Sequence, residues 1–115
     1  MKNKLLTIRN LEKNYHDIKT EIRAVDDVSF EVNKGEFISI VGPSGCGKST
    51  LIKIIGLLEN YDSGNIFINN QDISKTSLND QAKLRNEKIG FVFQDYLLDD
   101  YLNVYDNILL PTLLN

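Results

Sequence analysis

The sequence has 115 residues, of which 42% are hydrophobic and 25% charged, a composition typical of one globular domain or of part of one. The formal net charge is −3 and no basic stripe is visible, which argues against a nucleic acid as the main partner. A single cysteine excludes an internal disulfide, and no apolar run approaches the roughly 20 residues that a membrane helix needs.

Apolar patterns before residue 42 predict strands. Residues 4–13 mix apolar and polar side chains, which predicts a strand with one solvated face. Residues 27–32 and 36–41 are also apolar enough to be strands, and the turn at Lys34 and Gly35 between them predicts a β-hairpin. The segment 36–41 is nearly continuous in its apolar character, as expected of a strand buried on both faces.

Residues 42–50 fit the pattern G-x-x-x-x-G-K-[ST], the phosphate-binding P-loop. Its glycines let the backbone turn tightly and bring N–H groups close to an anion. The helix expected after the loop offers its own unpaired N–H groups and the positive end of its dipole to the same anion. The nucleotide-binding residues predicted in this loop are Gly42, Ser44, Gly45, Cys46, Gly47, Lys48, Ser49 and Thr50.

Two side chains of the loop carry specific chemistry. Lys48 is expected to reach the outer phosphates as a point charge, which makes it a candidate catalytic residue. The Ser49 hydroxyl is expected to ligate Mg²⁺ that bridges phosphate oxygens. The alternative is a glycine-rich connection without a ligand. The apolar strand pattern before the loop and the apolar helix pattern after it, to about residue 58, favour the P-loop.

Turns and apolar runs also divide the second half of the chain. Residues 62–64 (Asp-Ser-Gly) have turn chemistry, and residues 65–70 after them are expected to form a strand. Residues 77–87 are mostly polar, which predicts a short and largely exposed helix. Residues 89–93 predict a second buried strand, which ends at Gln94.

The chain changes character after Gln94. Residues 95–102 have no clean period and are expected to form a loop. Asn103 is a candidate N-cap for a helix from residue 104 onward, and Pro111 is expected to kink or shorten that helix.

Four landmarks, in order and spacing, resemble the nucleotide-binding subunit of ABC transporters. Tyr15 follows the first predicted strand, where the family carries an aromatic residue that stacks on adenine. Residues 42–50 match the Walker A loop, and residues 62–64 match the turn into the antiparallel subdomain. Gln94 stands where the family has its Q-loop glutamine. The segment from Gln94 onward is most similar to the branch that serves lipoprotein release, macrolide efflux and antimicrobial-peptide export.

The resemblance implies an α/β fold, with a P-loop NTPase core and an N-terminal antiparallel β subdomain. It implies ATP and Mg²⁺ as cofactors. Tyr15 would then stack on adenine, and Gln94 would help to hold Mg²⁺ and sense the γ-phosphate as a catalytic residue. The plainer alternatives are a loop aromatic packed on its own strand and an amide that merely ends a buried strand.

The resemblance also implies two protein partners. A second ATP-binding subunit is expected to pair head to tail with this one. A transmembrane permease subunit is expected to dock at the region from Tyr96 to Leu102, which combines aromatic and apolar side chains, and this would place the protein on the cytoplasmic face of the cell membrane. The alternative is that this region packs against the remainder of its own domain.

Several family motifs are absent from the 115 residues. The LSGGQ signature, the Walker B strand with its catalytic glutamate and the switch histidine follow the Q-loop in the family. We therefore expect residues 1–115 to be the N-terminal part of an ABC-type nucleotide-binding domain, truncated before its C-terminal half. The full-length protein is expected to hydrolyse ATP to drive export, and this chain alone to hydrolyse little or none. The alternatives are another P-loop NTPase, such as a small kinase or a GTPase, and a non-catalytic nucleotide-binding half domain.

Overall fold

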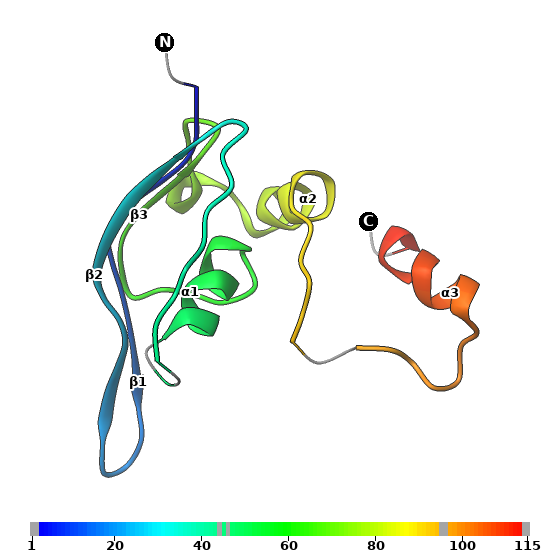
Figure 1. Ribbon diagram of the computed structural model, residues 1–115, viewed down its shortest axis with the longest axis horizontal. Helices are drawn as coiled ribbons and strands as arrows, with labels where there is room; N and C mark the ends of the chain where they lie inside the picture. Colours follow the sequence, from blue (N-terminus) through cyan, green and yellow to red (C-terminus); the bar gives the residue numbers. More distant parts are fainter. Residues whose placement is uncertain (1–2, 44, 46, 95–96, 114–115) are drawn as a thin grey trace.

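The computed structural model describes residues 3–43, 45, 47–94 and 97–113, and its largest element is an antiparallel sheet (Figure 1). The sheet has four strands in the order β2-β1-β3-β4. The strands are β1 (Lys4–His16), β2 (Glu21–Asn33), β3 (Ser63–Ile68) and β4 (Gln71–Asp72). The antiparallel β subdomain expected from the sequence is therefore present.

The two long strands form a hairpin with each other. β1 and β2 pair antiparallel, with Ile8 opposite Phe30 and Leu11 opposite Val28. The tight turn between them is closed by the backbone N–H of Asp17, which donates to the carbonyl of Thr20 at 2.8 Å. The predicted hairpin between residues 27–32 and 36–41 is therefore wrong. The second strand of the chain pairs with the strand before it instead of with the segment after it.

β3 begins where β1 bulges. The β1–β3 register shifts between Arg9 and Glu12, and Asn10 has a positive φ of 48°. Gly64 lies against this bulge with φ +100°, and a Cβ on Gly64 would lie 2.5 Å from the carbonyl oxygen of Asn10. Only glycine fits this position, both for its backbone conformation and for the close approach of the two strands. The strand predicted after residues 62–64 is present, but it begins at Ser63, so Ser63 and Gly64 belong to β3 and not to the predicted turn.

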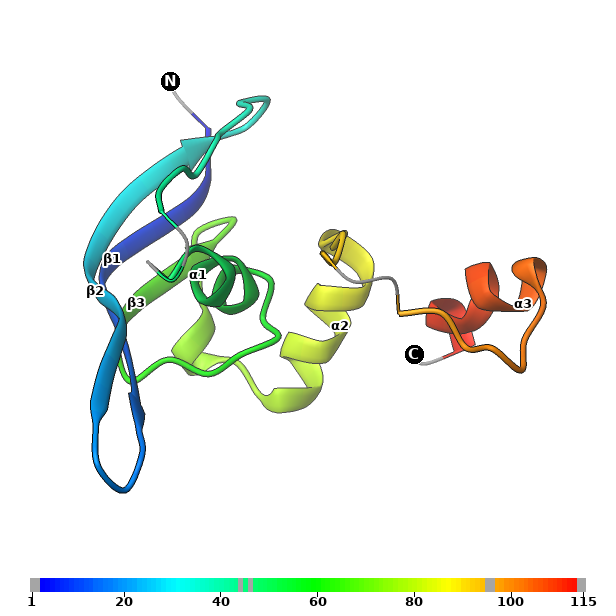
Figure 2. The same ribbon diagram turned by 60° about the horizontal axis from the view of Figure 1, so that its bottom comes forward.

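The core lies between the sheet and helix α1 (Lys48–Ile55), which covers one face of the strands (Figure 2). Leu51 and Ile54 of α1 are one turn apart and therefore point to the same side, into the core. The helix ends earlier than expected, at Ile55, because Gly56 caps it and Leu57 adopts a left-handed φ of 61°. The buried core consists of Ile8, Leu11, Val25, Leu51, Ile54, Leu57, Ile66, Ile68 and Ile73.

Two further α-helices follow the sheet, each started by a side-chain cap. α2 (Leu78–Lys88) is capped by Ser77, and α3 (Val104–Leu109) by Asn103, the cap that the sequence predicted. Short 3₁₀ turns cover Ile73–Lys75 (η1) and Leu110–Leu113 (η2). α3 and η2 stand apart from the sheet in both views (Figures 1 and 2). None of the helices in the described part of the chain has the length and apolar character needed to cross a bilayer.

The connection from α1 to the sheet is fixed by polar contacts. The Arg85 guanidinium of α2 donates to the carbonyl of Leu57 at 2.7 Å, which ties α2 to the end of α1. Burial, and then the negative charge of Asp72, raise the pKa of Tyr61 above its ordinary value. The phenol of Tyr61 is neutral at neutral pH even at its ordinary pKa, and its ring packs against the core.

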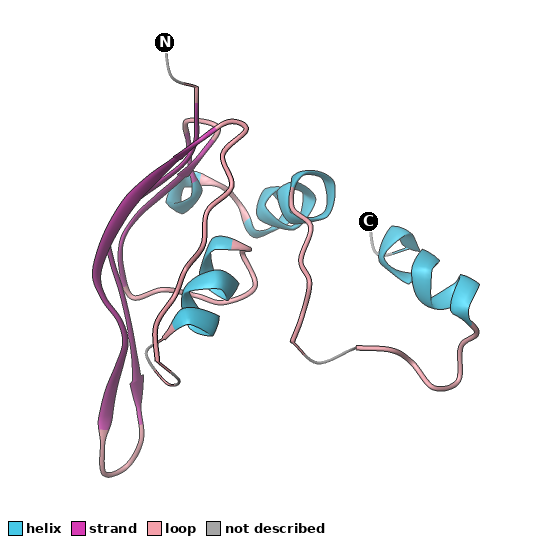
Figure 3. Cartoon of the chain, in the orientation of Figure 1, coloured by secondary structure: helices cyan, strands magenta, loops and turns pink. Residues whose placement is uncertain are grey.

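Two segments predicted as buried strands are not strands. Residues 36–41 and 89–93 are drawn as loops in Figure 3, and neither pairs with the sheet. Phe37 and Val92 are each 96% exposed. A strand forms only where another backbone completes its hydrogen-bond ladder, and no described segment does so here. Both segments are apolar, but the described residues do not provide the burial that this character predicts.

These exposed segments predict association of the isolated 115-residue chain. We expect it to be poorly soluble, without a sharp cooperative thermal transition at monomer size. A Phe37→Ser/Val92→Ser double variant is expected to bind less hydrophobic dye and to associate less. Its helix and strand content by circular dichroism should match that of the wild-type chain, because both side chains are exposed.

The matched control is Ile54→Ser, which replaces a side chain that is 0% exposed. It should disrupt the core, lower the helix and strand content and increase association. Sedimentation and dye fluorescence measure these effects. A monomeric wild-type chain with a cooperative transition would contradict the prediction.

Candidate phosphate-binding site

The structure gathers most of the predicted loop residues and Gln94 around one cavity of about 440 Å³. Gln94 is distant from the loop in sequence, but it reaches this cavity because residues 89–94 run back past α1. The residues that line the cavity are Gly45, Gly47, Lys48, Ser49, Thr50 and Gln94. Ser44 and Cys46 were also predicted to bind nucleotide, but they lie outside the described residues.

The start of α1 suits an anion. Gly47 is the N-cap residue, with φ 96° and ψ 8°, and no described side chain caps it. By contrast, α2 and α3 begin at Ser77 and Asn103, whose side chains accept a first-turn N–H. The first turn of α1 also carries no acidic residue. Its N–H groups and positive dipole end are therefore available to a phosphate.

Gly47 is required for a second reason, which the sequence did not reveal. A Cβ on Gly47 would lie 1.8 Å from the carbonyl oxygen of Ala24 in β2. The backbone of the loop therefore rests directly on the hairpin, and any larger residue would push the two apart. The sequence around Ala24 does not indicate this contact, because Ala24 and Gly47 are far apart in the chain and only the fold brings them together.

Lys48 folds back over its own loop. Its Nζ donates to the carbonyl of Gly42, and lies 3.3 Å from the carbonyl of Pro43. Ser49, the next residue, lines the same cavity. An ammonium group and a hydroxyl at the same helix start can bind the charge of a phosphate and the metal that accompanies it.

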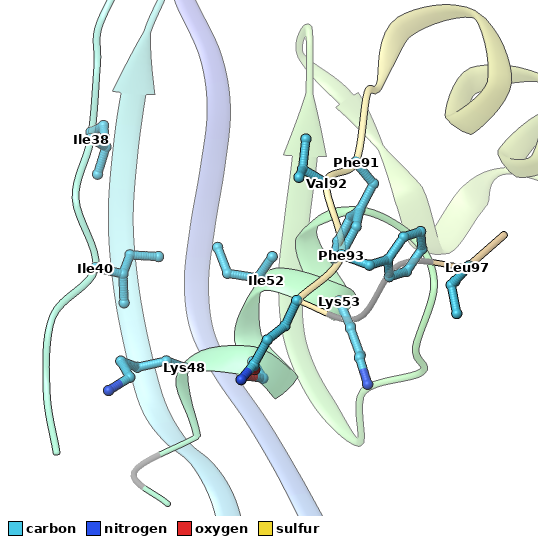
Figure 4. Close-up of a pocket in the computed structure, with 11 residues that line it drawn as sticks. Ile38, Ile40, Lys48, Ile52, Lys53, Phe91, Val92, Phe93 and Leu97 are labelled. Carbon is cyan, nitrogen blue, oxygen red and sulfur yellow. The ribbon is translucent and has the colours of Figure 1, made fainter. Parts of the chain in front are cut away.

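A second cavity of about 610 Å³ extends from the same residues into an apolar groove. Figure 4 shows Ile38 and Ile40 on one side and Phe91, Phe93 and Leu97 on the other, with Ile52 of α1 between them. The rings of Phe91 and Phe93 are in contact in a tilted arrangement, with their centroids 4.4 Å apart. A Cβ on Gly56 would lie 3.0 Å from the Phe91 ring, so this ring packs against the end of α1. Phe91 thereby holds the segment that ends in Gln94 near the loop.

Tyr15 is not part of either cavity. It lies at the end of β1 opposite Ile22 and is 40% exposed. The ammonium of Lys13 lies 5.2 Å from the centroid of its ring. An exposed aromatic face suits stacking on a base, but the role of Tyr15 stays a prediction.

The predicted permease-docking region is exposed at residues 97–101, whereas Leu102 is half-buried. Leu97, Leu98 and Tyr101 all have more than half of their surface exposed, and Tyr101 reaches 98%. Tyr96 lies outside the described residues. Asn107 of α3 holds this region, because its side chain bonds to the backbone at Asp99 and Leu102.

Comparison with known families decides the identity of the fold. The family model described as ABC transporter matches residues 25–113. The chain belongs to the ABC transporter family. Its solved relatives agree: the dimeric structure of the bacterial ABC transporter cassette MJ0796 matches with a TM-score of 0.87 and 37% sequence identity, over 94% of this chain and 47% of that chain. The predicted α/β P-loop fold with an antiparallel β subdomain is therefore confirmed.

Curated ABC relatives include both release and import subunits. The chain is 40% identical to the lipoprotein-releasing system ATP-binding protein LolD 1 of Rhodopirellula baltica, over 96% of this chain and 48% of the relative. It is 42% identical to the methionine import ATP-binding protein MetN 1 of Bacillus cereus, over 93% and 31%. It is 41% identical to the sulfate/thiosulfate import ATP-binding protein CysA of Pseudomonas aeruginosa, over 90% and 28%. The chain thus spans less than half the length of each of these relatives.

The close contact at Gly47 predicts a large effect of one methyl group in the full-length ABC protein. Gly47→Ala should lower the free energy of unfolding by about 3 kcal/mol or more, since the new Cβ meets both an unfavourable φ and the Ala24 carbonyl. The matched control is Gly35→Ala, which has a similar φ of +86° but no atom within 4 Å. It should cost about 1 kcal/mol.

Denaturant unfolding without nucleotide compares the two variants. Equal losses at Gly47 and Gly35 would show that backbone conformation alone accounts for the effect, and would contradict the contact with Ala24.

Proposed function

We propose that this chain is the N-terminal part of an ATP-binding subunit, which in its full-length form binds ATP with Mg²⁺ and couples ATP hydrolysis to transport through a membrane permease. The observation that carries the proposal is the cavity where the uncapped start of α1, Lys48, Ser49 and Gln94 meet. Membership of the ABC transporter family supports it. A relative of the same cassette type, MJ0796, has been solved with ADP and phosphate.

The phosphates would lie against the loop 42–50. Backbone N–H groups at the start of α1 bind the phosphate oxygens, and Lys48 supplies a full positive charge. To do so, Lys48 exchanges its contacts with the carbonyls of Gly42 and Pro43 for the ligand. Backbone carbonyls are neutral acceptors, so a phosphate oxygen is the stronger partner for the ammonium.

Mg²⁺ fits the donor set. Ser49 offers a hydroxyl and Gln94 an amide oxygen on the wall of the same cavity, and both are hard neutral ligands of the kind Mg²⁺ accepts. No group of three or more His, Cys, Asp or Glu side chains suited to a metal is present in the part of the chain that the structure describes. The ion would therefore take its anionic ligands from the nucleotide, where it neutralises charge that develops during hydrolysis.

The base would stack on Tyr15. Stacking of a base on an aromatic ring is worth roughly 1–3 kcal/mol and needs only an exposed ring face. The exposed ring of Tyr15 meets that requirement. This contact would add affinity for ATP over free phosphates, while the loop supplies most of the charge recognition.

Hydrolysis converts ATP and water to ADP and phosphate, and its catalysis depends on positioning and charge stabilisation. Lys48 would stabilise negative charge on the transferred phosphoryl group, and Gln94 would hold the metal and report the γ-phosphate. We assign the activation of the attacking water to no residue of this chain. The 115 residues alone should therefore bind ATP weakly and turn it over little.

Two protein partners complete the proposal. A second ATP-binding subunit would pair head to tail with this one, and the related MJ0796 cassette, which has been solved as a dimer, supports such pairing. A permease would dock at the region 96–102, where Leu97, Leu98 and Tyr101 are exposed. The protein would then lie on the cytoplasmic face of the membrane.

Export is the direction of transport that we propose. The LolD relative, whose name describes lipoprotein release, supports it. The import subunits MetN 1 and CysA have nearly the same identity to this chain, so identity alone does not separate the two directions. Family membership disfavours the small kinase or GTPase considered from the sequence. A non-catalytic nucleotide-binding half domain remains the competing proposal.

ATP binding and turnover test the proposal directly. The full-length protein is expected to prefer ATP to GTP and to hydrolyse it. Lys48→Ala should weaken ATP binding about 10- to 100-fold, the range expected for one charge-assisted contact. The matched control is Lys34→Ala, an exposed lysine in the turn before the loop, which should leave binding unchanged.

The same assay on the 115-residue chain separates the alternatives. Lys48-dependent hydrolysis by that chain alone would refute our assignment of an incomplete catalytic site. Absence of hydrolysis by the full-length protein would favour the non-catalytic half domain.

A further inference from the structure

Lys13 occupies an unusual position between two parts of the fold. It lies near the end of β1, and its ammonium is 3.5 Å from the carboxylate of Glu59, which follows α1. The same ammonium lies 5.2 Å from the centroid of the Tyr15 ring. One largely buried cation therefore contacts both the aromatic residue proposed to hold the base and the segment after the helix proposed to hold the phosphates.

This ion pair differs from the others that the structure describes. The Lys13 side chain is only 12% exposed and that of Glu59 33%. In the pair of Lys4 with Glu31 both side chains are more than 40% exposed, although the atoms are closer, at 2.9 Å. Exposed pairs contribute little because water and salt screen them, whereas a cation that is 12% exposed is costly to leave without its anionic partner.

Hydrogen bonds of backbone and side chains hold the same two segments together beside Lys13. The carboxylate of Asp62 accepts from the backbone N–H of Asn14 at 2.6 Å, and the N–H of Asp62 donates to the carbonyl of Glu12 at 2.9 Å. The Ser63 hydroxyl donates to the Glu12 carboxylate at 3.1 Å. The segment after α1 is thus fastened to β1 on both sides of Lys13, so Glu59 is a fixed anchor.

We propose that Lys13, held by Glu59, is a positioning residue that fixes the orientation of the Tyr15 ring for stacking on the base of a bound nucleotide. The inference rests on the proposed nucleotide binding. It adds that Lys13 affects how much free energy base stacking contributes to that binding. A cation near an aromatic ring favours the geometry in which the ring faces it. With the ring restrained in advance, less conformational entropy is lost when the base stacks.

The consequence is specific to the base. Loss of Lys13 should weaken binding of ligands that contain adenine, and leave binding of phosphates without a base unchanged. A merely structural role would weaken both, because the loop and α1 would shift together. ADP and pyrophosphate make the required comparison, since neither involves turnover.

The test measures ADP and pyrophosphate affinities of the full-length protein by calorimetry with Mg²⁺. Lys13→Met keeps the length of the side chain and removes its charge. It should weaken ADP binding about two- to fivefold, the range expected for a partly exposed cation–π contact, with pyrophosphate affinity unchanged. Lys13→Arg should restore ADP affinity, because a guanidinium also stacks on an aromatic ring.

Two further variants locate the effect. Glu59→Gln should reproduce part of the loss by releasing Lys13, and Lys13→Met should have no effect on ADP in a Tyr15→Leu background. The matched control is Lys4→Met, which removes a lysine and an ion pair from the same strand far from Tyr15 in sequence. It should leave both affinities unchanged.

The outcomes separate this inference from the proposed function. Normal ADP binding by Lys13→Met, with binding still dependent on Tyr15, would overturn the role of Lys13 alone. Equal losses for ADP and pyrophosphate would show a structural role and would also overturn it. A wild-type protein that binds neither ligand would refute the proposed function, and this inference with it.

Discussion

The contact between the backbone at Gly47 and the carbonyl of Ala24 determines how the rest of the structure is arranged. At this point the loop 42–50 touches the hairpin of β1 and β2 with no side chain between them. The contact places the start of α1 on β2, and Leu51 and Ile54 then enter the core from a fixed direction. Because Gly47 also adopts a left-handed conformation, one residue sets the loop's path and its distance from the sheet.

Local features of the fold were predictable from sequence because their causes are local. The helix starts at Ser77 and Asn103 follow from side chains that accept a hydrogen bond within three residues. The loop 42–50 is recognisable from its glycines and the adjacent Lys48. None of these features requires knowledge of distant contacts.

Predictions that failed depend on partners distant in the chain. The segment 36–41 has the apolar pattern of a strand, but a pattern does not specify which backbone will complete the ladder. The apolar pattern of residues 27–32 therefore predicts a strand correctly, but it does not show that this strand pairs with β1 instead of with residues 36–41. The contact of Gly47 with Ala24 and the ion pair of Lys13 with Glu59 were not predicted for the same reason. The spacing of Lys13 and Tyr15, two residues apart on one strand, was the only local signal that they share a face.

The proposed site divides into two parts that are held by different physical means. α1 is fastened to the hairpin at both ends, through Gly47 on Ala24 and through the segment of Glu59 on β1. The sheet and α1 therefore fix the position of Tyr15 relative to the loop 42–50.

Gln94 lies on a described segment that pairs with no strand of the sheet. This segment packs against the end of α1 through Phe91. Hydrogen-bonded ladders restrain a segment more tightly than one packed ring does, so Gln94 is restrained by fewer contacts than Tyr15 on β1. In the proposed site the nucleotide would therefore be recognised mainly by the hairpin and α1, whereas Gln94 lies on the less restrained segment.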